Sequence, residues 1–412
     1  MKTILVRGGR PLHGTVTADG SKNAVLPLLF ATLLTHGVSE FTGVPDIGDV
    51  RCALKILSAY GVRCDRPAPG KLRMDTRGVH PAEPDPADLR RLRASTYLLG
   101  AALGRFGRVR QGIYGGCAFC DRPIDLHLYA IRALGGREEP EGVFSGPLHS
   151  GVVDFPAVSV GATVNALLLA ATLPGETLIR NAAAEPHILS LIAYLRAAGA
   201  AVEVTPQGYR VRGGALHGAQ AAVIPDMIEA GTYLLAGLIT GGDVAVRTDP
   251  SHLTSFLPVL EGCGASVAVG ENSVFVSAAP GHTPPHPVDV ITAPYPGFPT
   301  DLHPPLVPLL ALRAGGHIRE TVFPARFGYL DGLARFAIRS LGRESATHIF
   351  PSVLCPATVA AKDLRGGVAA VLAALGAHGV SRVENADIIL RGYAGLCEKF
   401  RALGADMVLT ET

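Results

Sequence analysis

The feature that most constrains the fold of this 412-residue sequence is a segment pattern that recurs six times. In each copy a helical stretch of similar type ends in glycine and a strand follows, as in ILSAYGVRC, which ends at Cys64. The glycines are Gly61, Gly135, Gly199, Gly264, Gly342 and Gly404, roughly 62 to 78 residues apart. Because solenoid repeats are only about 20 to 50 residues long, this spacing indicates six larger modules.

The parts inside each module also recur in one order. A helix rich in small apolar residues, such as TVNALLLAATL, comes first, and a short strand such as ETLIRNA follows it. The helix that ends in glycine comes next, as in LRAAGAAVEV or AIRSLGRES, and an alternating strand closes the module. We therefore predict an α/β protein with two domains of three modules each. Since the first helix of each module is apolar nearly all round, we expect these helices inside a ring with sheets outside.

Composition and charge agree with two large domains and exclude some partners. Hydrophobic residues make up 48% of the chain and charged residues 17%, which is enough to bury two cores. A net charge of +2 gives no general attraction to nucleic acid or to a membrane surface. An anionic ligand must therefore meet a local cluster of cations.

The ends and the cysteines indicate a cytoplasmic protein. The N-terminal MKTILVRGG has no signal-peptide core and is predicted to be an edge strand. No apolar run reaches the roughly 18 residues that a bilayer crossing needs. Seven cysteines, an odd number in a long chain, favour reduced thiols over a disulfide framework.

A Cys-x-x-Cys spacing stands in the segment GGCAFCDRPIDLH, residues 115 to 127. Three interpretations are open: a redox dithiol, half of a zinc site, or a loop that holds one reactive thiol near an anionic substrate. A zinc site would need a second ligand pair, and neither His127 nor His187 has paired ligand spacing.

Nine stretches, taken together with this module order, resemble the enolpyruvyl transferases. They are GSKNAVLPLLFATLL, RASTYLLG, GGCAFCDRPIDLH, SVGAT, PDMIEAGTYL, APYPGFPTDLHPP, ETVFPARF, KDLRGG and LRGYAGLCEKFRALGA, and the similarity runs from Gly14 to Met407. The resemblance is strongest to the transferases that act on UDP-N-acetylglucosamine in cell-wall synthesis. It implies an inside-out α/β barrel of two pseudo-threefold domains, residues 1–20 plus 228–412 and the inserted residues 21–227, which carry the cysteine loop.

The resemblance also implies that phosphoenolpyruvate is a substrate. Its phosphate and carboxylate need several converging cations, and the matched motifs supply Lys22, Arg122, Arg326, Arg365 and Arg391. By resemblance these residues surround phosphoenolpyruvate from both domains, and Lys22 and Arg391 also act in catalysis. No metal or redox cofactor is needed.

Two further residues match catalytic positions of the family. Asp301 is the carboxylate expected at the acceptor hydroxyl, although without the family context a helix cap would be the simpler interpretation. Cys117 matches the loop cysteine assigned to proton delivery and to covalent capture of the enolpyruvyl group. The resemblance thus favours the single-thiol interpretation, and it leaves Cys120 without a role.

The acceptor is implied to be a uridine nucleotide. The turn RPIDLH looks like the family's uracil-recognising segment, and SVGAT offers backbone N–H groups at a helix start, where a plain helix cap is the simpler interpretation. The residues matched to nucleotide binding are Asn23, Arg93, Arg122, Asp125, Leu126, His127, Ser159, Val160 and Gly161.

Three departures from the family pattern bear on the identity of that nucleotide. Met227 replaces an arginine, Ala325 an asparagine and Ala394 a glutamate. UDP-N-acetylglucosamine is the acceptor that the family favours, whereas a smaller acceptor such as UMP, used in nucleoside-antibiotic synthesis, would retain the uracil turn and relax the sugar contacts. A shikimate-type transferase and a catalytically silent nucleotide binder are weaker alternatives. The sequence leaves the oligomeric state open.

Overall fold

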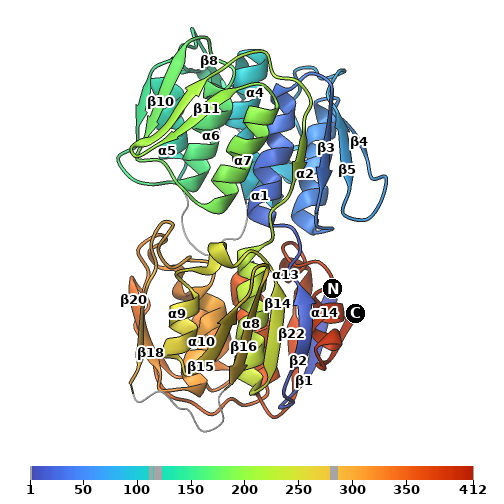
Figure 1. The fold of residues 1–412 in the computed structure, drawn as a ribbon, viewed down its shortest axis with the longest axis vertical. Coiled ribbons are helices and arrows are strands. Elements are labelled where there is room, and N and C mark those ends of the chain that lie inside the picture. The colour runs from blue at the N-terminus through green and yellow to red at the C-terminus, as the bar shows by residue number, and fades with distance from the viewer. Residues whose placement is uncertain (1, 111–114, 116–122, 279–285, 412) are drawn as a thin grey trace. The chain divides into compact units, whose positions relative to one another are not determined.

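The computed structural model describes residues 2–110, 115, 123–278 and 286–411. The chain forms two compact units (Figure 1). Unit 1 contains Met1–Asp19 and Pro225–Thr412, and unit 2 contains Gly20–Gly116 and Arg122–Ile224.

Unit 2 carries three sheets among its described residues, in the orders β13-β3-β5-β4, β6-β8-β7 and β11-β12-β10-β9. Its strands are β3 (Val38–Thr42), β4 (Arg63–Asp65), β5 (Leu72–Asp75), β6 (Arg108–Arg110), β7 (Arg137–Glu139), β8 (Val143–Ser145), β9 (Val152–Asp154), β10 (Glu176–Arg180), β11 (Ala201–Thr205), β12 (Gly208–Arg212) and β13 (Gln220–Ala222). Its helices are α1 (Lys22–Ala31), α2 (Gly48–Ala59), α3 (Pro86–Arg91), α4 (Leu98–Phe106), α5 (Asp125–Ala133), α6 (Val160–Ala170) and α7 (Pro186–Ala197), with 3₁₀ turns η1 (Thr32–Leu34), η2 (Arg93–Tyr97) and η3 (Pro140–Gly142).

Unit 1 repeats this arrangement, with sheets β15-β16-β14-β2, β17-β18-β20-β19 and β21-β22-β1-β23 in its described part. Its strands are β1 (Lys2–Gly8), β2 (His13–Thr17), β14 (Asp243–Arg247), β15 (Ala265–Val269), β16 (Ser273–Ala278), β17 (Val288–Ile291), β18 (Gly316–Arg319), β19 (Ser340–Leu341), β20 (Ala346–Ile349), β21 (Thr358–Ala360), β22 (Gly379–Glu384) and β23 (Asp406–Glu411). Its helices are α8 (Met227–Thr240), α9 (Leu257–Gly262), α10 (His303–Leu312), α11 (Leu330–Ala334), α12 (Leu364–Gly376), α13 (Ala386–Ile389) and α14 (Leu396–Ala402), with η4 (Pro250–Leu253) and η5 (Arg326–Tyr329).

One pairing scheme recurs in four of the six sheets of the described residues. In the modules built on α6, α10 and α12, the strand before this inner helix pairs in parallel with the strand after it: β9 with β10, β17 with β18 and β21 with β22. The strands β2 and β14 pair in the same way, but unit 2 is inserted between β2 and α8. The remaining pairs within the sheets are antiparallel, except β13 with β3. Most sheets of the inside-out α/β barrel therefore combine a parallel pair with added antiparallel strands, whereas β6-β8-β7 is antiparallel throughout its described part.

The inner helices form the core, as the sequence predicted. In unit 1, α8, α10 and α12 pack against one another, and nearly every residue of all three is buried. In unit 2, α6 packs against α4 and α5 and is buried from Ala162 to Ala170. The sheets lie outside these helices in each unit (Figure 1). Burying an apolar helix on all sides removes the whole of its surface from water, which is why its sequence lacks a polar stripe.

All six punctuating glycines have positive φ angles, from 83° at Gly61 to 113° at Gly199. Glycine adopts this conformation without steric cost. The recurring glycines of the sequence therefore stand where the chain reverses direction.

Two sequence predictions about elements were wrong. The N-terminal strand β1 is not an edge strand, because it pairs with β22 on one side and β23 on the other. The stretch AIRSLG is not the end of a helix: α11 stops at Ala334, Ala337 has a φ of 65°, and β19 then pairs with β20. A left-handed residue cannot continue a helix, so the glycine here ends a strand.

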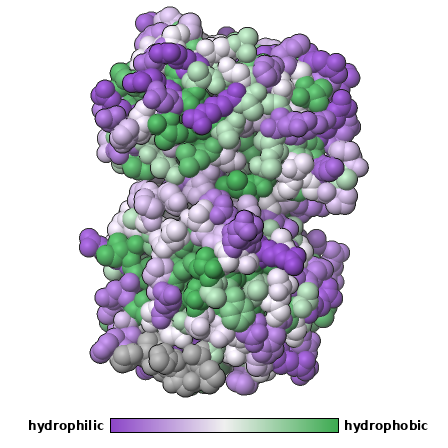
Figure 2. Space-filling view, viewed as in Figure 1, coloured by the Kyte–Doolittle hydropathy of each residue, from purple (hydrophilic) through white to green (hydrophobic). Residues whose placement is uncertain are grey.

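Hydrophobic and hydrophilic residues are interspersed on the face of each unit in Figure 2, as is normal for protein surfaces. Exposed apolar side chains include Val204, Val269 and Phe275, all on strands. Among the described residues, none of the helices combines the length and the apolar character that a bilayer crossing requires.

Candidate active site

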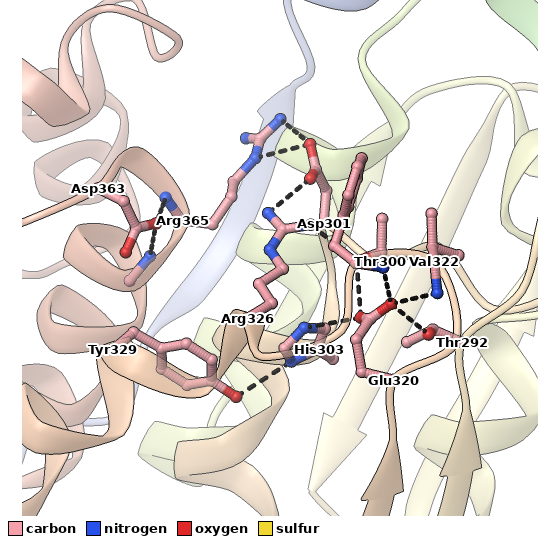
Figure 3. Close-up of polar contacts among 12 residues, drawn as sticks. Thr292, Thr300, Asp301, His303, Glu320, Val322, Arg326, Tyr329, Asp363 and Arg365 are labelled. Carbon is pink, nitrogen blue, oxygen red and sulfur yellow. Dashed lines mark hydrogen bonds and ion pairs between the residues drawn. The ribbon is translucent and has the colours of Figure 1, made fainter. Parts of the chain in front are cut away.

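Three segments of unit 1 that are distant in sequence bring charged side chains together (Figure 3). Asp301 lies in the turn before α10, Arg326 begins η5, and Arg365 is the second residue of α12. The side chain of Asp363 caps α12 by accepting hydrogen bonds from the N–H groups of Arg365 and Gly366. This cap fixes the start of the helix and hence the direction in which Arg365 leaves it.

Asp301 is held between the two guanidinium groups. Its Oδ1 accepts a hydrogen bond from Nη2 of Arg326 at 2.8 Å, and its Oδ2 accepts one from Nε of Arg365 at 3.1 Å. The arginine side chains are only 3% and 4% exposed, whereas that of Asp301 is 25% exposed. The cap residue of α10 is Leu302, so Asp301 stands one residue before the cap position.

A tyrosine supports Arg365 from its other side. Nη1 of Arg365 donates a hydrogen bond to the Tyr393 hydroxyl at 3.0 Å, and that hydroxyl lies 2.9 Å from the hydroxyl of Thr232. Burial acts to lower the pKa of Arg365, but Tyr393, Asp301 and Asp226 together raise it above its ordinary value, so the guanidinium stays charged. Arg391 is half-buried in the turn between α13 and α14, two residues before Tyr393.

A second group of predicted residues lies in unit 2. Lys22 begins α1, and its Nζ lies 3.5 Å from Oδ2 of Asp49, which is buried on α2. Asn23 follows on the same helix and is half-buried. Arg93 begins η2 and donates a hydrogen bond to the carbonyl of Pro123 at 3.2 Å, just before α5. Arg93 therefore ties η2 to the segment that leads into the predicted uracil turn.

The predicted uracil turn and the serine-glycine turn meet at a buried histidine. His127 on α5 is 5% exposed, and its Nδ1 lies 2.7 Å from the amide nitrogen of Asn165 on α6. A Cβ added to Gly161 would lie 2.7 Å from Cε1 of His127, so only glycine allows this approach. The Ser159 side chain accepts a hydrogen bond from the N–H of Ala162, which makes it the cap of α6.

Asn165 also determines which nitrogen of His127 carries the proton. Its Oδ1 accepts a hydrogen bond from the N–H of Gly100, and its amide group donates to the carbonyl of Thr96. The amide group is therefore a donor toward His127 as well, so Nδ1 of the neutral ring is the acceptor and Nε2 carries the proton.

Asp125, Leu126 and Val160 complete the predicted set within the described residues. Asp125 is exposed at the start of α5, Leu126 is half-buried next to it, and Val160 is the first residue of α6. Cys117, Cys120 and Arg122 lie outside the described residues.

The described cysteines are free thiols, and burial makes three of them unreactive. Burial raises the pKa of Cys263 to about 12 and the pKa values of Cys64 and Cys397 to about 11, so these three are poor nucleophiles at neutral pH. Cys355 is exposed. No group of three or more His, Cys, Asp or Glu side chains that could hold a metal ion is found in residues 2–110, 123–278 and 286–411.

The sequence interpretation missed several residues that hold these groups in place. Thr300, Glu320, Tyr393 and Asn165 all contact predicted site residues or their neighbours. The first three stand inside the matched stretches APYPGFPTDLHPP, ETVFPARF and LRGYAGLCEKFRALGA, so the stretches themselves were the signal. Asp49 lies outside all nine stretches, and nothing in the sequence marks it.

The known sequences that this chain resembles are carboxyvinyltransferases. A family model described as EPSP synthase (3-phosphoshikimate 1-carboxyvinyltransferase) matches residues 6–400. The chain is 38% identical over 428 residues to UDP-N-acetylglucosamine 1-carboxyvinyltransferase 2 from Streptococcus thermophilus. It is 38% identical over 423 residues to the protein of the same name from Lactococcus lactis. Both matches cover 100% of this chain and of the relative.

Solved structures agree on the fold. The enolpyruvyl transferase NikO from Streptomyces tendae superposes with a TM-score of 0.86 at 23% identity, covering 100% of this chain and 99% of that one. EPSP synthase from Acinetobacter baumannii superposes with a TM-score of 0.72 at 16% identity over the full length of both chains.

Proposed function

Because the chain belongs to the enolpyruvyl transferase family, we propose that it transfers the enolpyruvyl group of phosphoenolpyruvate to the 3-hydroxyl of UDP-N-acetylglucosamine, with release of phosphate. The observation that carries the proposal is Asp301 held between Arg326 and Arg365. A carboxylate beside two buried cations combines a base for the acceptor hydroxyl with a binding site for the phosphate or carboxylate of phosphoenolpyruvate.

The proposed reaction is an addition followed by an elimination. The acceptor oxygen bonds to C2 of phosphoenolpyruvate as Asp301 removes the hydroxyl proton, and C3 receives a proton from an acid, for which Cys117 is the candidate. Loss of a C3 proton and of phosphate then restores the double bond. Addition and elimination together leave the acceptor as an enol ether, and no electrons are exchanged with a cofactor.

The arginines have a second role in this scheme. With Asp301 as their anion, Arg326 and Arg365 are held in place at low exposure. An incoming dianion competes for the same donors, so its binding releases Asp301 to accept a proton. Lys22, Arg122 and Arg391 are the further cations assigned to phosphoenolpyruvate, and Asn23, Arg93, Asp125–His127 and Ser159–Gly161 are assigned to the nucleotide.

A second acceptor has one observation in its favour. Met227 begins α8 with an apolar side chain, and Ala325 and Ala394 are short side chains where the family carries longer polar ones. Such losses suit a smaller nucleotide such as UMP. The relatives that are 38% identical are named for UDP-N-acetylglucosamine, so that nucleotide remains the proposed acceptor. A cytoplasmic location remains a prediction from the sequence.

Phosphate release from phosphoenolpyruvate tests the proposal when UDP-N-acetylglucosamine, UMP and shikimate 3-phosphate are offered separately. We expect release with UDP-N-acetylglucosamine. Release with UMP alone would move the assignment to the second acceptor, and release with shikimate 3-phosphate alone would remove the nucleotide assignment.

A further inference from the structure

Glu320 is a buried carboxylate next to the Asp301 cluster with no role in the proposed chemistry. It follows β18, is 1% exposed, and accepts hydrogen bonds on both oxygens. Oε1 accepts from the N–H groups of Val322 and Phe323 and from the hydroxyl of Thr292, at 2.7 to 2.8 Å. These three bonds shape the turn after β18.

The other oxygen of Glu320 contacts one residue before Asp301 and one residue after it in the sequence (Figure 3). Oε2 accepts a hydrogen bond from the hydroxyl of Thr300 at 2.7 Å and lies 3.0 Å from Nε2 of His303. Thr300 directly precedes Asp301, and His303 follows it by two residues. One buried oxygen therefore anchors the chain on either side of the candidate base.

The charge state of this group follows from its partners. Burial acts to raise the pKa of Glu320, but the interactions with His303, with the N–H of Phe323 and with the Thr300 hydroxyl outweigh it and lower the pKa below its ordinary value. Burial lowers the pKa of His303 and raises that of Tyr329 well above its ordinary value. At neutral pH the group is thus an ionised Glu320, a neutral His303 and a protonated Tyr329.

These states give every hydrogen bond a direction. The Thr300 hydroxyl must point its proton at Glu320, because an ionised carboxylate only accepts, and its lone pairs are then left for Nη1 of Arg326 at 2.7 Å. Nε2 of His303 lies 3.0 Å from the same carboxylate as an ionic contact and not as an aligned hydrogen bond, and it carries the ring proton because Nδ1 accepts from the protonated Tyr329 hydroxyl at 3.0 Å. Arg326 then places its other terminal nitrogen on Asp301.

We propose that Glu320 is a positioning residue of the active site, which uses Thr300 and His303 to fix Asp301 and to aim the guanidinium of Arg326 at the phosphoenolpyruvate position. This inference rests on the proposed function. Glu320 touches neither substrate in this scheme and acts through the polarity of its hydrogen bonds.

The first test breaks the link between Glu320 and Arg326. Thr300→Val removes the hydroxyl, and it should raise the KM for phosphoenolpyruvate by about tenfold or more, since Arg326 loses a charged hydrogen bond that orients it. Thr300→Ser keeps the hydroxyl and should restore the KM to within about twofold of wild type. The KM for the nucleotide should stay unchanged in both variants.

Thr292→Val is the matched control, because it removes a threonine hydroxyl from the other oxygen of Glu320. It should lower the melting temperature and leave the KM for phosphoenolpyruvate unchanged. An unchanged KM in Thr300→Val, or an equal rise in Thr292→Val, would overturn the positioning role.

The second test does not depend on turnover. In Glu320→Gln the three donors at Oε1 retain the carbonyl oxygen, so the amide group faces Thr300 and His303, and the ring proton of His303 should move from Nε2 to Nδ1. Nitrogen-15 NMR of protein labelled at histidine measures this change of tautomer. The protein has 14 histidines, so a His303→Asn variant is needed to assign the signal of His303. An unchanged tautomer would overturn the polarity argument. If the wild-type protein does not use phosphoenolpyruvate, the proposed function is contradicted instead. The tautomer of His303 would still show whether Glu320 sets the direction of the hydrogen bonds around it.

Discussion

At the scale of single residues, Asp301 has an uncommon environment for a candidate base. It is partly exposed, yet two almost fully buried guanidinium groups donate to it. Its partners follow it by 25 and 64 residues, so no spacing rule could have predicted the cluster. The sequence did identify all three members through matched motifs, but it could not identify Thr300 and Glu320 as supports, because hydrogen-bond partners across a fold have no local signature.

Asp301→Asn tests the base assignment. The amide keeps the shape and can still accept a hydrogen bond, but it is a poor proton acceptor, so turnover should fall by about 10²-fold or more. Nucleotide affinity, measured by calorimetry, should stay within a few-fold of wild type. Asp289→Asn, at an exposed carboxylate on β17, is the control and should change neither quantity. Full turnover in Asp301→Asn would remove the base assignment.

Thiol chemistry gives an independent prediction. An epoxide analogue of phosphoenolpyruvate should label Cys117, whereas the buried Cys64, Cys263 and Cys397 should stay unlabelled because burial raises their pKa values. Cys355 is exposed, so the experiment is best run in a Cys355→Ser background. Mass spectrometry that located the adduct on Cys120 would contradict the assignment, and Cys117→Ser should abolish labelling without unfolding the protein.

At the scale of elements, most of the fold could be predicted, and the exceptions have physical causes. Helix–glycine–strand patterns predicted the modules because chain reversal needs left-handed residues, which glycine supplies. The prediction failed at AIRSLG, where Ala337 takes the left-handed conformation without being glycine. It failed again at β1, since a local pattern does not reveal that β22 and β23 from the far end of the chain flank this strand.

Ala325 has a backbone conformation that is unfavourable for alanine. It precedes η5 with a φ of 64°, a conformation that asparagine tolerates better than alanine. Ala325→Asn should therefore raise the free energy of unfolding by up to about 1 kcal/mol. Thermal unfolding would show this as a higher melting temperature. Ala334→Asn, at an exposed helical position nearby, should give no gain, and a gain of equal size there would contradict the explanation.

At the scale of the whole molecule, unit 1 is made from both ends of the chain, and one ionic cluster joins these segments. Glu229 on α8 accepts hydrogen bonds from the N–H of Asp19, at the end of the first segment, and from Nζ of Lys399 on α14. Nζ of Lys399 also lies 2.8 Å from the Asp19 carboxylate. The cluster therefore fixes the point at which the chain leaves unit 1.

Glu229 makes the stability of the protein depend on pH. Burial, partly offset by Lys399, raises its pKa to about 7, above the ordinary value of about 4.3. The folded state thus binds a proton at Glu229 more tightly than the unfolded state does. The stabilisation that this proton gives is complete below about pH 4.3 and is lost as the pH rises through 7. Between pH 5 and 7.5 the free energy of unfolding of the wild type should fall by on the order of 2 kcal/mol relative to that of Glu229→Gln. Urea unfolding at both pH values measures this, and parallel changes in the two proteins would contradict it.

The identity of the product tests enolpyruvyl transfer most directly. Wild-type protein is incubated with phosphoenolpyruvate labelled with carbon-13 at C2 and with UDP-N-acetylglucosamine, and the product is examined by NMR and mass spectrometry. We predict that the labelled carbon becomes an enol-ether carbon attached to the 3-hydroxyl of the sugar, with one phosphate released for each product formed. Unchanged phosphoenolpyruvate, or its hydrolysis to labelled pyruvate without a nucleotide adduct, would contradict enolpyruvyl transfer to this nucleotide.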